Sequence, residues 1–84
     1  ALIDALPGVG ESAVVGVPHP DFGEVGLAVV TSDRALSEEA ILASLKGRLA
    51  NYKVPKRVVF EDELPRNAMG KVQKNLLRDR YREL

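Results

Sequence analysis

The sequence predicts an α+β domain in which a small sheet of about three strands is flanked by helices. Three short runs rich in β-branched residues end at turn-forming clusters, and two longer segments place their apolar residues at helical spacing. With 84 residues, 45% apolar and 29% charged, the chain has enough apolar surface for one core and lacks the composition typical of disorder. We therefore expect residues 1–84 to form a single domain.

The N-terminal half predicts a helical turn followed by two strands. The apolar spacing of residues 1–6, closed by Pro7 and Gly8, indicates the last turn of a helix that begins before this chain does. Residues 12–17 and 25–31 are short apolar runs, largely β-branched, and each ends at a turn-forming cluster. These two runs are the first two predicted strands.

A helix is expected over residues 38–50. Ser37 is a favourable N-cap, and Glu38 and Glu39 lie in the first turn, where the helix dipole favours acidic side chains. The apolar residues of the segment fall on one face: Ile41, Leu42, Leu45 and Leu49. This face predicts a helix that packs against the sheet.

The C-terminal half predicts a third strand, a loop and a second helix. Residues 52–55 end the preceding helix, residues 57–60 form a strand, and residues 66–70 form a loop. From about Val72 the apolar residues return to helical spacing: Leu76, Leu77, Tyr81 and Leu84. Basic residues lie mostly on the other face: Lys74, Arg78, Arg80 and Arg82. The predicted order is strand, strand, helix, strand, loop, helix.

The charge is unevenly distributed along the chain although the formal net charge is zero. Residues 1–45 hold one basic and seven acidic side chains, which gives −6, whereas residues 46–84 hold eleven basic and five acidic ones, which gives +6. This asymmetry predicts an anionic partner for the C-terminal half. The sequence pI of 6.8 and the scarcity of aromatic residues argue against a nucleic-acid binder.

The residue types also exclude several kinds of protein. Without cysteine the chain has no disulfide, thiolate metal site or thiol nucleophile. No apolar run approaches the roughly 18 residues that a membrane-spanning helix needs, and the first residues do not resemble a signal peptide. We therefore expect a cytoplasmic domain with neither a membrane nor a nucleic acid among its partners.

Four short motifs favour structural rather than functional interpretations. Residues 8–13 match Gly-x-Gly-x-x-Ala, but a helix precedes and a strand follows them, which is the reverse of a dinucleotide site. Gly70-Lys71 lacks the Ser or Thr of a phosphate-binding loop. His19 has no second His or Cys with which to bind zinc. The side chains of the three adjacent acids, residues 61–63, alternate in direction and cannot all converge on one cation. We expect a turn at His19, a solvated strand end at residues 61–63 and no metal site.

The segment 49–78 is far more specific: LANYKVPKRVVFEDELPRNAMGKVQKNLLR. It resembles the C-terminal motifs of the adenylate-forming superfamily, which includes acyl-CoA synthetases, luciferase and peptide-synthetase adenylation domains. A Tyr-Lys-x-Pro turn leads to a strand, then to Leu-Pro and Gly-Lys. Residues 8–24 resemble another stretch of the same family, so the similarity covers nearly the whole chain. Residues 52–78 are most similar to malonyl-CoA synthetases.

The resemblance implies a C-terminal lid domain that is part of a larger acid–thiol ligase. A large N-terminal domain, absent here, would bind ATP, Mg²⁺ and a malonate-like carboxylic acid. Lys71 would be the catalytic lysine of acyl-adenylate formation, on a loop supported by Pro65 and Gly70, where a side chain would obstruct close backbone approach. The 84 residues alone would then be inactive.

The resemblance further implies a second orientation of the lid in which coenzyme A reacts. Lys53, Lys56 and Arg57 are the candidate ligands for its phosphates. Lys71 also lies in a sequence context like that recognised by a protein lysine acetyltransferase, and acetylation would remove its charge. The alternative is a non-enzymatic module that binds anions or serves as an acetylation target. A long reading frame with an ATP-binding loop before Ala1 would favour the ligase.

Overall fold

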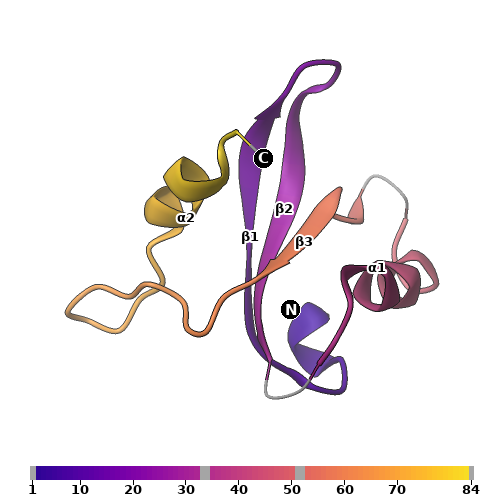
Figure 1. Ribbon diagram of the computed structural model, residues 1–84, viewed down its shortest axis with the longest axis horizontal. Helices are drawn as coiled ribbons and strands as arrows, with labels where there is room; N and C mark the ends of the chain where they lie inside the picture. Colours follow the sequence, from indigo (N-terminus) through magenta and orange to yellow (C-terminus); the bar gives the residue numbers. More distant parts are fainter. Residues whose placement is uncertain (1, 33–34, 51–52, 84) are drawn as a thin grey trace.

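The computed structural model describes residues 2–32, 35–50 and 53–83. Its elements are η1 (Ile3–Ala5), β1 (Val9–His19), β2 (Gly23–Ser32), α1 (Glu38–Lys46), β3 (Arg57–Phe60) and α2 (Lys74–Tyr81) (Figure 1). The predicted α+β class, the three strands and the order of the elements are confirmed.

The sheet has the strand order β1-β2-β3, so β2 is central. β1 and β2 form an antiparallel hairpin in which Val17 pairs with Val25. β3 lies parallel to β2, with Val58 opposite Ala28, and α1 provides the crossover that a parallel pair requires.

β2 is buried on both faces of the sheet. Its residues from Leu27 to Val30 are all fully buried, which is why the run is continuously apolar rather than alternating. One core packs under η1 and α1: Ile3, Leu6, Ala28, Val30, Ile41, Leu45 and Val58. The other packs under α2: Ala13, Val15, Val17, Leu27, Val29, Leu64 and Leu77. The helices α1 and α2 therefore cover opposite faces of the sheet (Figure 1).

Both hairpin strands are longer than predicted. Ladder pairing continues to Pro18 opposite Glu24 and to His19 opposite Gly23. β1 is an edge strand, so Pro18 can be accommodated where the missing N–H is not needed by a further strand. At the other end, η1 is a short 3-10 turn, which agrees with a helical turn before β1.

α1 begins as predicted but ends earlier. The Ser37 hydroxyl accepts a hydrogen bond from the Ala40 amide at 3.0 Å, so the N-cap is confirmed. The helix stops at Lys46 because Gly47, a poor helix former, follows. Leu49 still packs against the core under α1, so the predicted apolar stripe is correct although residues 47–50 are not α-helical.

α2 differs from prediction in which leucines it buries. Leu77 is fully buried and Tyr81 packs beside it, whereas Leu76 is 41% exposed because adjacent helical residues point about 100° apart. Leu84 lies outside the described residues.

The prediction of a solvated strand end was wrong for Glu61. Its carboxylate is half-buried, forms an ion pair with Arg80 and accepts a hydrogen bond from the Tyr81 hydroxyl. Burial and the neighbouring Glu61 raise the pKa of Tyr81 to about 12. Asp62 and Glu63 are exposed, as expected. The ion pair and hydrogen bond therefore tie α2 to the end of β3.

The two adjacent leucines of α2 provide a matched test of this packing. Leu77→Ala should lower the free energy of unfolding by about 3 kcal/mol, because it leaves a cavity in a closed core. Leu76→Ala removes the same atoms from the surface and should cost less than about 1 kcal/mol. Urea unfolding followed by circular dichroism measures both, and equal losses would contradict the assignment of faces.

Candidate functional site

Lys71 lies in a short hairpin, residues 66–72, between β3 and α2. Arg66 and Val72 pair as an isolated antiparallel bridge. The Asn67 amide donates to the Lys71 carbonyl and the Gly70 amide donates to the Asn67 carbonyl, each at 3.0 Å. This pattern is that of a three-residue loop that ends in a left-handed glycine. We call residues 66–72 the Lys71 hairpin.

Gly70 adopts a left-handed backbone conformation in this hairpin. Its φ is +81°, a conformation that favours glycine. Apart from Gly70 itself and its two chain neighbours, no described residue has an atom within 4 Å of the position that a Cβ would take, so crowding within this domain does not exclude a side chain. Gly70 is therefore required by the backbone conformation of the turn.

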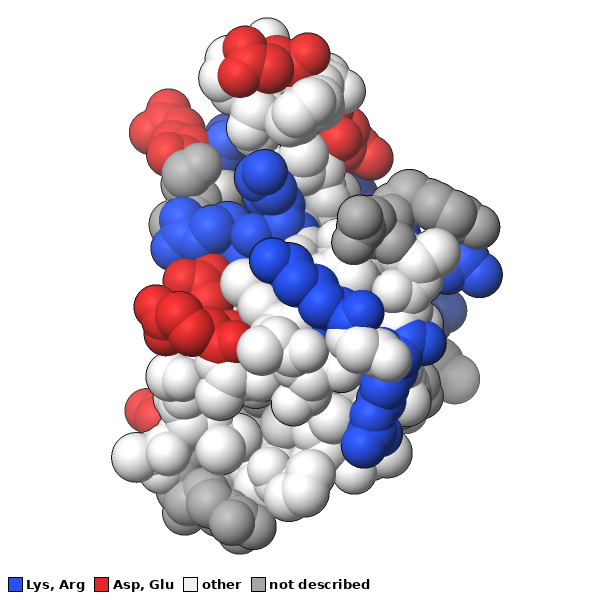
Figure 2. All heavy atoms as spheres, turned by 90° about the vertical axis from the view of Figure 1, so that its right-hand side faces the viewer, with Lys and Arg blue, Asp and Glu red and all other residues white. Residues whose placement is uncertain are grey.

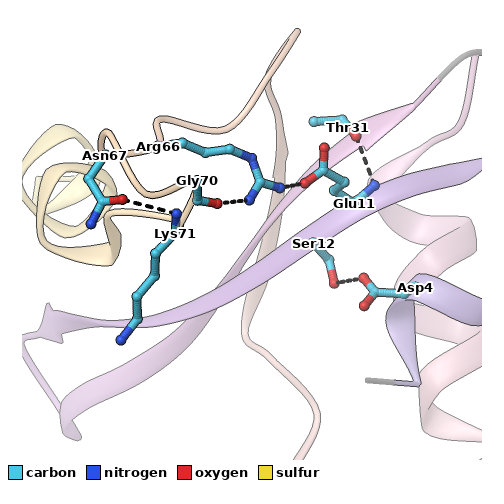
Figure 3. Close-up of polar contacts among 8 residues, drawn as sticks. All are labelled: Asp4, Glu11, Ser12, Thr31, Arg66, Asn67, Gly70 and Lys71. Atoms are coloured by element: carbon cyan, nitrogen blue, oxygen red, sulfur yellow. Dashed lines mark hydrogen bonds and ion pairs between the residues drawn. The ribbon is translucent and has the colours of Figure 1, made fainter.

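Side chains hold the peptide bond between Gly70 and Lys71 at both ends (Figure 3). The Arg66 Nη1 atom donates to the Gly70 carbonyl at 2.6 Å. On the other side of the same peptide, the Lys71 amide donates to Asn67 Oδ1 at 3.1 Å, and the Met69 amide donates to the same oxygen at 2.9 Å. The direction in which the Lys71 side chain leaves the backbone is thus fixed.

The base of the hairpin is also closed. The Pro65 carbonyl accepts a hydrogen bond from the Gln73 amide at 2.9 Å. Leu64 and Leu77, which lie on either side of the hairpin in sequence, are both buried in the core under α2. The hairpin is consequently anchored at both ends to the same face of the sheet, and Pro65 lies at its base.

The Lys71 side chain itself is exposed and extends away from the hairpin (Figure 3). No hydrogen bond or ion pair to its ammonium is present within residues 2–32, 35–50 and 53–83. A fixed backbone thus carries a positive charge on a long flexible stem, which suits contact with an anion outside this domain.

The other predicted basic residues lie elsewhere. The Lys71 hairpin and the start of β3 are on opposite sides of the molecule (Figure 1). Arg57 is the first residue of β3, and the segment that leads into β3 contains Lys53 and Lys56. Figure 2 shows Lys and Arg side chains gathered over the side that carries α1 and the start of β3. Lys56 and Arg57 also line a hollow of 180 Å³ beside the β1–β2 hairpin. The structure therefore separates Lys71 from the candidate coenzyme A ligands.

The three coenzyme A candidates differ in their surroundings. Arg57 Nε lies 2.7 Å from a Glu38 carboxylate oxygen, so its charge is already paired within the domain. The Lys56 ammonium lies 5.7 Å from the centre of the exposed Phe22 ring. Lys53 is exposed. Lys56 is consequently better placed than Arg57 to attract a further anion.

Two of the short motifs behave as expected. The Nδ1 atom of His19 accepts hydrogen bonds from the amides of Asp21 and Phe22, at 3.1 and 3.3 Å, as a turn residue would. Gly8 has a φ of +86° and precedes β1, which is the predicted turn between a helical turn and a strand. Tyr52, part of the recognised Tyr-Lys-x-Pro turn, lies outside the described residues.

Neither a metal-binding cluster nor a membrane-spanning helix is found in the part of the chain that the structure describes. It contains no group of three or more His, Cys, Asp or Glu side chains that could hold a metal ion. None of its helices is long and apolar enough to cross a membrane.

Comparison with known proteins defines the class to which this fold belongs. The family model for the AMP-binding enzyme C-terminal domain matches residues 1–71. The chain therefore belongs to the C-terminal domain family of AMP-binding enzymes, as its motifs suggested.

Individual relatives are CoA ligases of which the chain spans about one sixth. It is 54% identical to a methyl-dioxo-octahydroindenyl propanoyl:CoA ligase of Rhodococcus jostii, over 88% of this chain and 15% of that protein. It is 43% identical to the long-chain-fatty-acid–CoA ligase FadD13 of Mycobacterium tuberculosis, over 96% of this chain and 16% of that protein. Apo and ATP-bound MatB from Rhodopseudomonas palustris are 58% and 57% identical over 96% of this chain, covering 17% and 16% of those chains, each with a TM-score of 0.93.

Sequence reasoning missed the residues that fix the Lys71 backbone. Asn67, three positions before Gly70, is a turn signal that could have indicated the loop geometry. The partners of Arg66 and Arg57, which are Glu11 and Glu38, are 55 and 19 positions away and leave no local signal.

The Glu38 contacts predict a pH-dependent contribution to stability. Hydrogen bonds from the Val58 amide and Arg57 lower the pKa of Glu38 below its ordinary value of 4.5. The ionised carboxylate therefore stabilises the fold above pH 4.5, and this stabilisation is lost as the pH falls through the lower folded-state pKa. Glu38→Gln should be less stable than the parent at pH 7, and the difference should shrink on acidification.

Urea unfolding between pH 7 and pH 3 measures that difference. The control is Glu39→Gln, which removes an exposed carboxylate from the same helical turn and should change the free energy of unfolding less at pH 7. A Glu38→Gln deficit that stays constant across the range would contradict the interpretation.

Proposed function

We propose that this chain is the mobile C-terminal domain of an ATP-dependent carboxylate:CoA ligase and that Lys71 acts in acyl-adenylate formation. The observation that carries the proposal is the Lys71 hairpin, which fixes the lysine backbone and leaves its ammonium exposed and unpaired among the described residues. Family membership supports the class of enzyme. ATP, Mg²⁺ and the acid would be held mainly by an N-terminal domain.

The proposed chemistry needs a cation for a stated reason. A carboxylate oxygen attacks the α-phosphorus of ATP, the bond to the β-phosphate bridging oxygen breaks, and pyrophosphate leaves. Two anionic groups approach each other in this step, so an ammonium close to the acyl and phosphoryl oxygens stabilises the transition state. Lys71 is suited to this task because its stem can reach beyond the domain surface while its backbone stays fixed.

Thioester formation would use the opposite side of the domain. Lys53, Lys56 and Arg57 lie at the start of β3, away from Lys71, which fits a domain that presents one side in each half-reaction (Figure 1). Lys56 beside the Phe22 ring is the best candidate for a coenzyme A phosphate. Arg57 would contribute less than Lys56, because Glu38 already neutralises much of its charge.

For the acid, we propose malonate on the basis of residues 52–78, which resemble malonyl-CoA synthetases. Two similar relatives are named for a long-chain fatty acid and for a bicyclic propanoate, so similar C-terminal domains accompany very different acids. Specificity would therefore be set in the N-terminal domain. A panel of carboxylic acids offered to the ligase that contains this chain would identify the substrate.

Lys71→Ala in the ligase that contains this chain should reduce ATP–pyrophosphate exchange by about 10²- to 10³-fold. The reason is the loss of a positioned charge, and Lys71→Arg should not restore full activity because a planar guanidinium differs in shape from an ammonium. Preformed acyl-adenylate should still be converted to thioester. Lys74→Ala, which removes an exposed lysine at the start of α2, is the matched control.

Unchanged exchange in Lys71→Ala would overturn the catalytic role and favour the alternative of a non-enzymatic anion-binding module.

The exposure of Lys71 also supports the acetylation proposal, since a protein lysine acetyltransferase could reach it. Mass spectrometry should then find the acetyl group at Lys71, and the acetylated protein should lose exchange as Lys71→Ala does.

Lys56→Ala should raise the KM for coenzyme A by roughly fivefold, which corresponds to the loss of one exposed ionic contact. It should leave ATP–pyrophosphate exchange unchanged. Arg57→Ala should raise it less because of the Glu38 pair. Steady-state kinetics with varied coenzyme A measures both effects. A larger effect for Arg57→Ala than for Lys56→Ala would contradict the proposed ranking.

A further inference from the structure

We propose that Glu11 and Arg66 are positioning residues that set the direction of Lys71 during acyl-adenylate formation. The inference rests on the proposed function of Lys71 and adds a specific structural connection between β1 and the Lys71 hairpin. Neither residue needs to touch ATP or the acid, because both act through the backbone of the peptide that precedes Lys71.

Arg66 links the hairpin to the sheet through two different nitrogens. Its Nη1 atom donates to the Gly70 carbonyl at 2.6 Å, and its Nη2 atom forms an ion pair with the Glu11 carboxylate (Figure 3). A guanidinium can serve two partners at once because its donors are arranged in a rigid fork. Movement of the Gly70–Lys71 peptide relative to β1 would therefore strain or break one of these contacts.

Glu11 is directed toward the hairpin by an irregularity in β1. The register of β1 against β2 shifts between Val9 and Ser12, and such bulges redirect side chains. At this point the Glu11 amide donates to Thr31 Oγ1 at 2.9 Å (Figure 3). A Cβ at Gly10 would lie only 2.8 Å from the same oxygen, so Gly10 leaves the space that the Thr31 hydroxyl occupies.

The exposure of the pair argues against a mainly stabilising role. The Arg66 and Glu11 side chains are 41% and 49% exposed, and ion pairs at such positions contribute little to stability. What the pair does restrict is geometry, because it holds one end of a peptide whose other end is held by Asn67. Variants of Glu11 and Arg66 should therefore remain folded, which makes a kinetic test possible.

Glu11→Gln separates positioning from simple electrostatics. Removing a negative charge near a site for anionic ATP should speed adenylation if only the net charge matters. Loss of the Arg66 anchor should slow it, because misplacing a catalytic group by about 1 Å can cost roughly 100-fold. Arg66→Lys provides the complementary change, since it keeps the charge but cannot serve Gly70 and Glu11 together in the same geometry.

The experiment measures ATP–pyrophosphate exchange and conversion of preformed acyl-adenylate to thioester in the ligase that contains this chain. Glu11→Gln and Arg66→Lys should each lower the kcat of exchange by about 10- to 100-fold, leave the KM for ATP within about twofold, and leave the thioester step unchanged. In a Lys71→Ala background neither should cause a further loss. Arg82→Gln, which removes an exposed ion pair with Asp79 on α2, is the control for a surface arginine.

Exchange as fast as or faster than the parent in Glu11→Gln would overturn the proposal, as would equal losses in both half-reactions. A further loss in the Lys71→Ala background would also overturn it, because the pair would then act independently of Lys71. If the melting temperature shows that Glu11→Gln is unfolded, Arg66→Lys decides the matter alone. Unchanged exchange in Lys71→Ala would instead overturn the proposed function, which keeps the two failures distinct.

Discussion

Burial of β2 on both faces is the constraint on which the rest of this domain depends. A strand that is fully apolar from Leu27 to Val30 must be covered on both sides, so α1 and α2 pack on opposite faces of the sheet. Two leucines on either side of the Lys71 hairpin in sequence, Leu64 before it and Leu77 in α2, are then buried in the same core. The Lys71 hairpin lies between these leucines in sequence, and its position follows from their packing.

The domain carries its candidate basic residues on two separate sides. Lys71 extends from the hairpin, whereas Lys53, Lys56 and Arg57 lie at the start of β3 across the sheet (Figure 1). In a two-step ligase, one side would serve adenylation and the other would serve coenzyme A. Ion pairs within the domain leave some of these basic side chains more available to an outside anion than others. Glu38 pairs with Arg57, and Glu11 pairs with Arg66. The Lys71 ammonium has no partner among the residues described.

Local patterns in the sequence were sufficient for the order of elements, the N-cap at Ser37 and the burial of Ile41 and Leu45, because periodicity and capping act over a few residues. The exposure of Leu76 and the pairing of Glu61 depend instead on how α2 docks against the end of β3. The family resemblance indicated Lys71 and Asn67 is a turn signal, but the Arg66 contact that holds the other end of the peptide was not predictable. The Arg66 partner, Glu11, is 55 positions away, on a strand irregularity that no local pattern signals.

Lys71 combines a flexible side chain with a fixed backbone, and amide hydrogen exchange of this chain tests the fixed backbone most directly. The Lys71 amide is bonded to Asn67 Oδ1, whereas the Ala68 amide of the same loop has no hydrogen bond within the described residues. NMR-detected exchange, corrected for intrinsic rates, should be about tenfold or more slower at Lys71 than at Ala68. Equal rates at the two amides would show that the loop is mobile as a whole and would contradict the account.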